Sequence, residues 1–329
     1  MFKSLISLVL IASFMMLFSC SKNSTEPTKT EFEVVQQALD TYLSGDLPPV
    51  IKAEALHADL NNYFVISVRA PEDYAKGHIP GAINIPWRTI AQSASISQLP
   101  TDGKTIVTYC YTGHTGQIAA TVLNALGYKT LNMKYGIMAW TKDANVRVQT
   151  GFSEETEAHD YPVETKVNTV STTYDLPELD NTTSTDDQEI IMAAANAYVS
   201  EKAPVIKAEA LYNELNDGDA SNDPQIISVR APEDYAKGHI PGAINIPWRT
   251  IAKTEKLQKI NPSKPIVVYC YTGHTGQIAT TVLNMLGYDA LNLKYGIMSW
   301  TKDPNVRVQT GFSEETEAHN YELHTGTNP

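Results

Sequence analysis

Residues 105–126 read TIVTYCYTGHTGQIAATVLNAL, and this stretch decides the fold. Thr105–Tyr109 is mostly β-branched and aromatic, which predicts a strand, and Gly116–Leu126 has helical spacing and is ended by Gly127. A short polar loop that starts at Cys110 joins the two segments. Because ligands of open α/β sheets collect at the carboxyl ends of strands, we expect the sulfur of Cys110 at a binding edge.

The same alternation continues along the chain in both directions. Helices are expected over Glu31–Leu43, Ala53–Leu60 and Pro71–Lys76, and strands over Tyr63–Val68, Ala82–Ile85 and Lys129–Asn132. Strands that are separated by helices pair in parallel and have helices on both faces of the sheet. The sequence therefore predicts an α/β fold.

The chain is a tandem repeat. Tyr109–Ala119 recurs letter for letter as Tyr269–Ala279, and Ile66–Ala91 recurs as Ile227–Ala252. This period is too long for a solenoid and indicates two whole domains, which we place at residues 31–160 and 188–329. The segment between them, residues 161–187, is rich in Thr, Ser and acidic residues. We expect it to be a disordered linker that lets the two domains act independently.

Composition excludes several classes of protein. The 329 residues include 25 Lys and Arg against 37 Asp and Glu, a net charge of −12, which argues against a nucleic-acid partner. Three cysteines make neither a disulfide framework nor a four-thiolate zinc site within one domain. We interpret Glu154, Glu155, Glu157 and His159 as a solvated acidic face rather than a metal site, and we expect no metal and no cofactor.

The first 30 residues have the pattern of a targeting segment. Residues 1–19 contain one lysine and a short apolar run, which is typical of a secretory signal peptide, although an uncleaved membrane anchor is the alternative. Leu17–Cys20 resembles the lipobox of bacterial lipoproteins, which implies lipidation of Cys20, and residues 20–30 form a polar tether. We expect an exported protein, lipid-anchored to a bacterial membrane and facing the periplasm or the cell exterior.

Each copy has one cysteine that suits chemistry. A loop that enters a helix directs backbone N–H groups and the positive end of the helix dipole toward the sulfur, and both favour the nucleophilic thiolate. A small buried hydrophobe at a strand end is the alternative interpretation. In an exported protein a free thiol is notable, which favours the functional interpretation.

Three motifs in order resemble those of rhodanese domains: Val65–Pro86, Cys110–Gly116 and Gly127–Trp140. The resemblance implies two tandem rhodanese-like domains, each a parallel sheet flanked by helices, and a sulfurtransferase that carries sulfane sulfur as a cysteine persulfide. It would take sulfur from a thiosulfate- or polysulfide-like donor and pass it to a thiol or cyanide. The implied nucleophiles are Cys110 and Cys270. Arg69 and Arg230 are expected in supporting roles, either holding the domain together or approaching the loop. The implied substrate-binding loops comprise Tyr111, Thr112, Gly113, His114, Thr115 and Gly116, and Tyr271, Thr272, Gly273, His274, Thr275 and Gly276.

The sequence departs from the rhodanese pattern at two points. Ser67 stands where many members have Asp, and Thr115 stands near the usual loop Arg or Lys. Without a permanent cation, an anionic donor depends on backbone N–H groups, threonine hydroxyls and protonated His114, which predicts weak thiosulfate binding or a donor of lower charge. The same absence excludes the related phosphatases and arsenate reductases, which clamp an oxyanion with arginine. A non-catalytic binding or sulfur-sensing module at the cell envelope is the alternative function.

Overall fold

The structure is a computed structural model and describes residues 29–202 and 204–327. The N-terminal half contains a five-stranded sheet in the order β1-β5-β4-β2-β3, and every neighbouring pair is parallel. Its strands are β1 (Val50–Ile51), β2 (Tyr63–Ser67), β3 (Ile83–Asn84), β4 (Thr105–Tyr109) and β5 (Thr130–Met133). The predicted α/β fold is confirmed, although the sequence patterns did not indicate β1.

Helices separate these strands. They are α1 (Glu31–Ser44), α2 (Ala53–Ala58), α3 (Pro71–Lys76), α4 (Ser93–Ile96), α5 (His114–Ala125), α6 (Ile137–Trp140) and α7 (Ala144–Arg147). The start of α1 is fixed by a capping box, in which Thr30 accepts from the Glu33 N–H and the Glu33 carboxylate accepts from the Thr30 N–H.

The C-terminal half repeats the first. Its strands β6 (Val205–Ile206), β7 (Gln225–Ser228), β8 (Ile244–Asn245), β9 (Ile266–Tyr269) and β10 (Ala290–Leu293) form a parallel sheet in the order β6-β10-β9-β7-β8. The helices are α8 (Asp187–Glu201), α9 (Ala208–Glu214), α10 (Pro232–Tyr235), α11 (Thr254–Leu257), α12 (His274–Met285), α13 (Ile297–Trp300) and α14 (Pro304–Arg307). The strand order is therefore the same in both halves.

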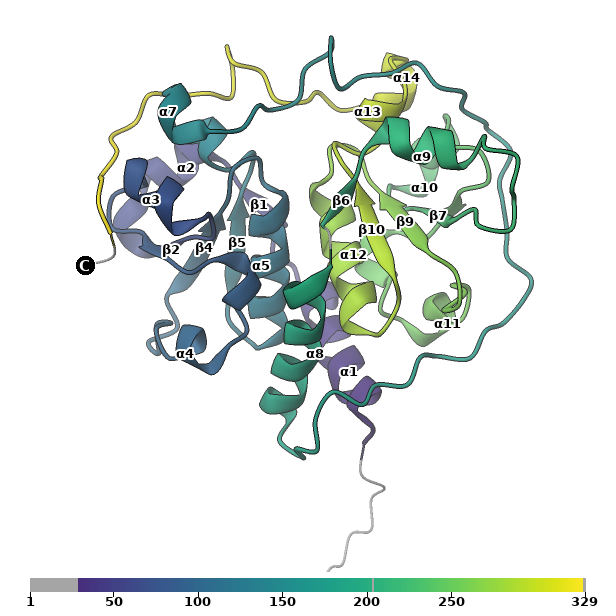
Figure 1. The fold of residues 1–329 in the computed structure, drawn as a ribbon, viewed down its shortest axis with the longest axis horizontal. Coiled ribbons are helices and arrows are strands. Elements are labelled where there is room, and N and C mark those ends of the chain that lie inside the picture. The colour runs from purple at the N-terminus through teal and green to yellow at the C-terminus, as the bar shows by residue number, and fades with distance from the viewer. Residues whose placement is uncertain (1–28, 203, 328–329) are drawn as a thin grey trace, which may run out of the picture.

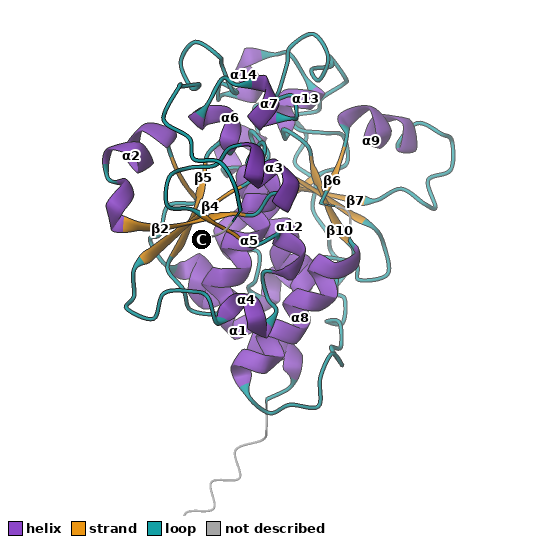
Figure 2. Cartoon of the chain, turned by 60° about the vertical axis from the view of Figure 1, so that its left-hand side comes forward, coloured by secondary structure: helices purple, strands orange, loops and turns teal. Residues whose placement is uncertain are grey.

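The two halves share a hydrophobic cluster between their sheets. Helices α1, α5, α8 and α12 lie between the two sheets (Figures 1 and 2). Leu39 of α1, Val122 of α5, Val199 of α8 and Val282 of α12 are all fully buried and belong to one apolar cluster. The apolar face of each of these helices is covered by the other helices. The halves are therefore joined by a buried interface. The expectation of independently moving domains is wrong.

The first helix of each half contacts the other half. The Arg249 guanidinium donates to the carbonyl of Leu43 at the end of α1 at 3.0 Å. In the equivalent contact, Arg88 donates to the carbonyl of Val199 at the end of α8 at 2.7 Å. Helix α1 therefore bridges the halves rather than belonging to the first half alone.

The segments that follow α7 and α14 are exchanged in the same way. After α7 the chain crosses to the second half, where the Trp300 indole donates to the Pro162 carbonyl at 2.7 Å. After α14 it crosses to the first half, where the Trp140 indole donates to the Glu322 carbonyl at 2.8 Å. We call residues 148–164 and 308–325 the crossover tails. Each tail completes the surface of the half to which it does not belong.

The segment at residues 161–187 does not have the contacts of a free coil. The Tyr174 N–H donates to the Gln258 carbonyl at 3.0 Å, and the Thr182 N–H donates to Glu31 at 2.9 Å. Leu176 and Leu179 pack against the shared cluster. The few apolar side chains of this polar segment bind it to the protein, which corrects the prediction of a disordered linker.

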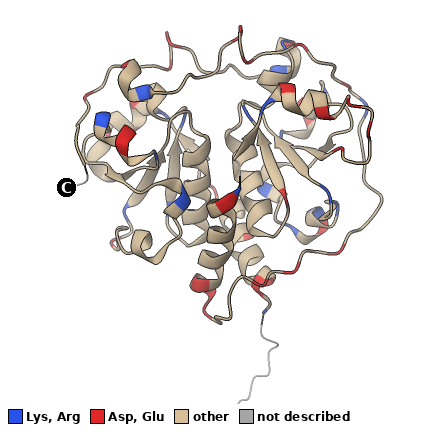
Figure 3. Cartoon of the chain, in the orientation of Figure 1, with Lys and Arg blue, Asp and Glu red and all other residues tan. Residues whose placement is uncertain are grey.

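Two further expectations concern membranes and charge. The lipobox and Cys20 lie outside the described residues, and among the described helices none is long and apolar enough to cross a bilayer. In the view of Figure 3, basic and acidic residues are interspersed over the outer elements.

Candidate active site

The two loop cysteines have the same surroundings. Cys110 follows β4 and is 2% exposed, and Cys270 follows β9 and is 1% exposed. The N–H of Gly113 donates to Cys110 Sγ at 3.1 Å, and the N–H of Gly273 donates to Cys270 Sγ at 3.1 Å. Each sulfur thus lies at the carboxyl end of a central strand and accepts a hydrogen bond from the loop backbone.

The loop backbone requires glycine. Gly113 has a φ of +100°, and this left-handed conformation precedes helix α5. A side chain at Gly116 would collide with the amide oxygen of Asn132 and lie 3.2 Å from the Cys110 nitrogen. Since α5 begins at His114, two residues before the predicted start, Thr115 and Gly116 lie in the first turn of the helix rather than in the loop.

An asparagine that the sequence analysis did not single out holds each loop. The side-chain amide of Asn132, on β5, donates to the Gly113 carbonyl at 2.9 Å, and Asn292 donates to the Gly273 carbonyl at 3.0 Å. Both asparagines are fully buried. The sequence feature that could have indicated these residues is an asparagine at the same position of two mostly apolar strands, TLNM and ALNL.

Tyr111 and Thr112, which were both predicted to bind substrate, make different contacts. The Tyr111 hydroxyl donates to the Asp73 carboxylate at 2.6 Å and accepts from the Ala70 N–H at 3.1 Å, so it anchors the loop to the start of α3. The Thr112 hydroxyl lies 3.2 Å from His114 Nδ1. The second loop repeats these contacts.

The two loops meet each other through their histidines. The His114 and His274 rings stack at a centroid distance of 6.3 Å, and a Cβ on Gly113 would lie 2.6 Å from His274 Nε2. The Tyr135 N–H donates to His274 Nε2 at 3.4 Å, which places the ring proton on Nδ1. Each histidine therefore contacts the loop of the other half.

Burial keeps both rings neutral. Burial, with Lys294 nearby, lowers the pKa of His114 to about 4. Burial, followed by the influence of His114 and Lys134, lowers the pKa of His274 to about 3. The expectation that protonated His114 binds an anionic donor is therefore wrong at neutral pH, because neither imidazole is charged there.

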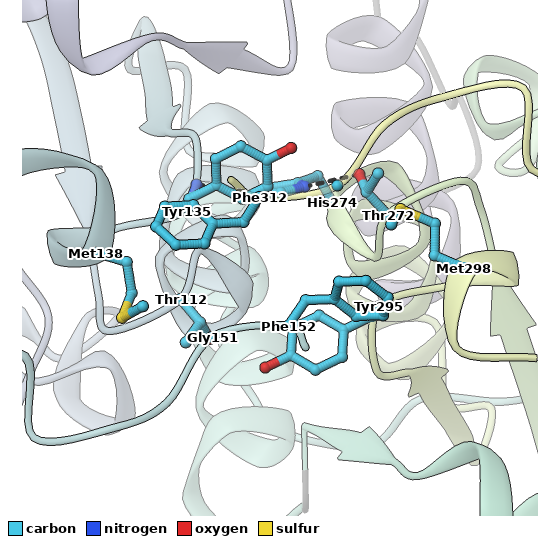
Figure 4. A pocket seen from close by; sticks show the side chains of 11 residues that line it. Thr112, Tyr135, Met138, Gly151, Phe152, Thr272, His274, Tyr295, Met298 and Phe312 are labelled. Atoms are coloured by element: carbon cyan, nitrogen blue, oxygen red, sulfur yellow. Dashed lines mark hydrogen bonds between the residues drawn. The ribbon is translucent and has the colours of Figure 1, made fainter. Parts of the chain in front are cut away.

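A pocket lies between the two loops (Figure 4). Its cavity volume is about 20 Å³, which is room for about one water molecule. Its lining comprises Thr112, Tyr135, Met138, Gly151 and Phe152, and Thr272, His274, Tyr295, Met298, Gly311 and Phe312. Tyr135 and Tyr295 have φ values of 63° and 64°, and bulky residues with positive φ cluster at functional sites. The sequence analysis missed the aromatic and methionine walls.

Comparison with known families agrees with this geometry. The rhodanese-like domain family matches residues 52–143 and 207–303, which together are more than half of the chain. The chain belongs to the rhodanese-like family. Each of the two rhodanese-like domains carries one of the loop cysteines, and the parallel sheets described above are the sheets of these domains.

Relatives of the rhodanese-like domains are named for sulfur transfer. A sulfurtransferase of Allochromatium vinosum is 33% identical over 98 residues, which are 30% of this chain and 87% of that protein. An adenylyltransferase and sulfurtransferase of Meyerozyma guilliermondii is 33% identical over 95 residues, which are 27% of this chain and 22% of that protein. The crystal structure of a rhodanese-like domain protein from Staphylococcus aureus is 29% identical, with a TM-score of 0.28, and the match covers 31% of this chain and 94% of that one. The family and the two relatives named as sulfurtransferases support a sulfurtransferase-type enzyme.

The buried arginines of the rhodanese-like domains hold the framework. Arg69 is fully buried and donates to the Val146 carbonyl at 3.0 Å, to the Gly77 carbonyl at 2.5 Å and to Ser67 Oγ at 3.3 Å. Arg230 makes the same set of contacts. These arginines connect a strand end to the segments after it.

The acidic run after the first domain has a structural function. Glu154 pairs with Arg307 at 2.6 Å and Glu157 with Lys294 at 3.1 Å, so these carboxylates link the two domains instead of only facing solvent. Across residues 29–202 and 204–327, no group of His, Cys, Asp and Glu side chains has the arrangement of a metal site.

Proposed function

We propose that this protein is a sulfurtransferase in which Cys110 and Cys270 each carry sulfane sulfur as a persulfide. The observation that supports this most strongly is the backbone N–H that points at each sulfur at 3.1 Å, in two loops of identical sequence. A cysteine that served only as a small buried apolar side chain would not need such a donor.

The reaction is a double displacement. The cysteine thiolate attacks the sulfane sulfur of the donor, and the bond from that sulfur to the rest of the donor breaks. With thiosulfate, sulfite leaves with the bonding electrons and the cysteine becomes a persulfide. A thiol or cyanide then attacks the outer sulfur, and the cysteine thiolate leaves. The Gly113 and Gly273 N–H groups stabilise the negative sulfur before and after each transfer.

The intact mass of the protein tests this proposal. After incubation with thiosulfate or with inorganic polysulfide, the mass should rise by one sulfur atom for each reactive cysteine, and cyanide should remove the increase. If no sulfane donor adds sulfur, the cysteines are not persulfide carriers. That result supports the alternative of a non-catalytic binding or sensing module.

Cysteine variants assign the sulfur to its positions. Because the two loops are equivalent, Cys110→Ser and Cys270→Ser should each leave about half of the persulfide and of the turnover, and the double variant should leave none. Loss of all turnover in one single variant, with persulfide still forming at the other cysteine, would mean that sulfur passes between the domains.

We also propose that the protein is anchored by a lipid on Cys20 and faces the periplasm or the cell exterior. Several acyl chains on one residue give stable membrane attachment, whereas one chain does not. Mass spectrometry of the membrane fraction should find an acylated peptide that begins at Cys20. A soluble chain that retains Met1 would contradict this proposal.

A further inference from the structure

The C-terminal ends of α5 and α12 have different surroundings, although the two helices are equivalent. Gly127 follows α5 and Gly287 follows α12, with φ values of +87° and +84°. A Cβ built on Gly287 would lie 3.0 Å from Leu179 Cδ2 and 3.1 Å from Pro177 Cβ. A Cβ built on Gly127 would have no atom of the described residues within 4 Å. The segment before α8 therefore covers one helix end and leaves the other open.

The segment that covers the end of α12 runs along the second half to the start of α8 (Figure 1). Leu176 and Leu179 pack against the shared cluster, and neither lies in a helix or strand. The Asn181 and Thr182 N–H groups then donate to the Glu31 carboxylate, each at 2.9 Å. The covered groove is thus filled by two leucines and a proline, and a carboxylate at the start of α1 binds the backbone that follows them.

The uncovered counterpart is a groove of about 660 Å³. It lies between α1, the C-terminal end of α5 and the start of α8, and its lining includes Ala38, Tyr128 and Ile191. Tyr128 is half-buried there, whereas Tyr288, its counterpart beside the covering segment, is 2% exposed. This volume is within the range of binding sites, so the groove has room for several side chains.

Asp187 gives the open groove an equivalent carboxylate. Thr30 caps α1 and Asp186 caps α8, each by accepting from the N–H three residues later, so Asp187 corresponds to Glu31. Asp187 lines the open groove, and within residues 29–202 and 204–327 its carboxylate accepts no hydrogen bond. It can therefore accept from the backbone of a bound chain, as Glu31 does in the covered groove.

The sequence before α1 does not repeat the apolar side chains of the covering segment. In the same register, Leu176–Leu179 (LPEL) corresponds to residues 20–23, which read CSKN. Residues 21–28, SKNSTEPT, contain no Leu, Ile, Val, Phe or Met. Because apolar side chains fill the covered groove, a stretch of this composition does not reproduce the same burial. An occupant with leucines at these positions has to come from another molecule.

We propose that the open groove docks an extended segment of a partner protein with the pattern Leu-Pro-x-Leu, whose following N–H groups donate to Asp187. The proline restricts the backbone before binding, so less conformational entropy is lost on docking. The lining contains two lysines and two aspartates, so recognition depends on apolar contacts and backbone hydrogen bonds rather than on net charge. The lining includes neither Cys110 nor Cys270, so docking can be measured without sulfur transfer.

A peptide with the sequence of the covering segment, residues 171–183 (STTYDLPELDNTT), is the probe. With a fluorescent label it should bind the full chain with a Kd on the order of 100 µM or tighter. The peptide with Leu176→Asp and Leu179→Asp should bind about tenfold or more weakly, because the burial of both leucines is lost. Absence of saturable binding up to ~1 mM would overturn the inference.

A variant on α1 connects the binding to the groove. Thr41 is exposed and lines the groove, so Thr41→Arg should fill part of it and weaken peptide binding by about tenfold or more. Ala197→Arg places the same side chain at the equivalent exposed position of α8, outside the groove lining, and is the matched control. Its Kd should stay within about twofold of the wild type. The same Kd for both folded variants would contradict the inference.

The number of bound peptides tests whether the two grooves are equivalent. One peptide should bind per wild-type chain, because the second groove is already filled. Leu176→Asp with Leu179→Asp in the chain should release the covering segment, and this folded variant should bind two peptides. A ratio that stays at one would overturn the inference. Peptide binding that becomes about tenfold or more stronger on deletion of residues 21–28, or in Cys20→Ser, would show that the chain's own N-terminal part fills the groove, which would also overturn it.

Discussion

Acidification should destabilise the protein through His114 and His274. Both rings are buried between the domains, and their pKa values are lowered to about 4 and about 3 from an ordinary 6.5. In the unfolded chain both rings bind a proton below about pH 6.5, whereas in the folded protein they remain neutral down to about pH 4. The unfolded state therefore binds more protons between these limits, and stability falls as the pH falls through this window.

The size of the effect follows from linkage. Between pH 7.5 and pH 5, each imidazole should reduce the free energy of unfolding by about 2 kcal/mol, and the pair by about 4 kcal/mol. This is a large part of a typical stability of about 5–15 kcal/mol.

Urea unfolding at the two pH values measures the effect. The double variant His114→Gln with His274→Gln cannot take up the two protons, so most of the decrease should disappear. His324→Gln, which removes a half-exposed histidine, should keep the wild-type decrease. His78 also has a pKa lowered by burial, but it is unchanged between the wild type and the double variant and cancels in that comparison. If the folded double variant loses as much stability as the wild type, the two imidazoles are not the groups responsible.

Three further outcomes are expected. Asn132→Ala should slow sulfur loading at Cys110 by about tenfold or more but not at Cys270, by peptide mass spectrometry, because it removes the side-chain donor that holds the Gly113 carbonyl of the loop; equal loading would contradict this. Val148 is a β-branched residue with a φ of 49°, so Val148→Asn should raise the urea midpoint by an amount that corresponds to about 1 kcal/mol, and a lower midpoint would be against it. Because the two domains share a hydrophobic cluster, tryptophan fluorescence and circular dichroism should follow a single unfolding transition; two separate transitions would disprove this coupling.

The local structure could be predicted from the sequence. The strand over Thr105–Tyr109 was predicted with its observed bounds, and the helix after it was predicted to start two residues late. The reason for the late start is local: Gly113, in a left-handed conformation, ends the loop one residue before His114. Short-range spacing and glycine positions carry this kind of information.

The relation between the domains could not be predicted. The apolar face of α1 indicates that another element must cover this helix. It does not indicate that Arg249 of the other domain donates a hydrogen bond to the backbone at the end of α1. Likewise, Phe152 lay in a segment that recurs in the second copy, yet its contact with Tyr295 depends on the crossover of the tails. The polar composition of residues 161–187 indicates a free coil. The contacts of a few apolar side chains are nevertheless enough to bind this segment to the rest of the protein.

The exchange of the crossover tails has a consequence for the symmetry of the chain. Each half lacks a tail of its own and receives one from the other half, through equivalent contacts at Trp140 and Trp300. This is the arrangement of a homodimer that exchanges its tails, contained here in one polypeptide. Residues near the internal two-fold axis, such as His114 and His274, face their counterparts in the other half. A mutation there changes only one side of the contact, so the single chain can carry an asymmetry that a homodimer cannot.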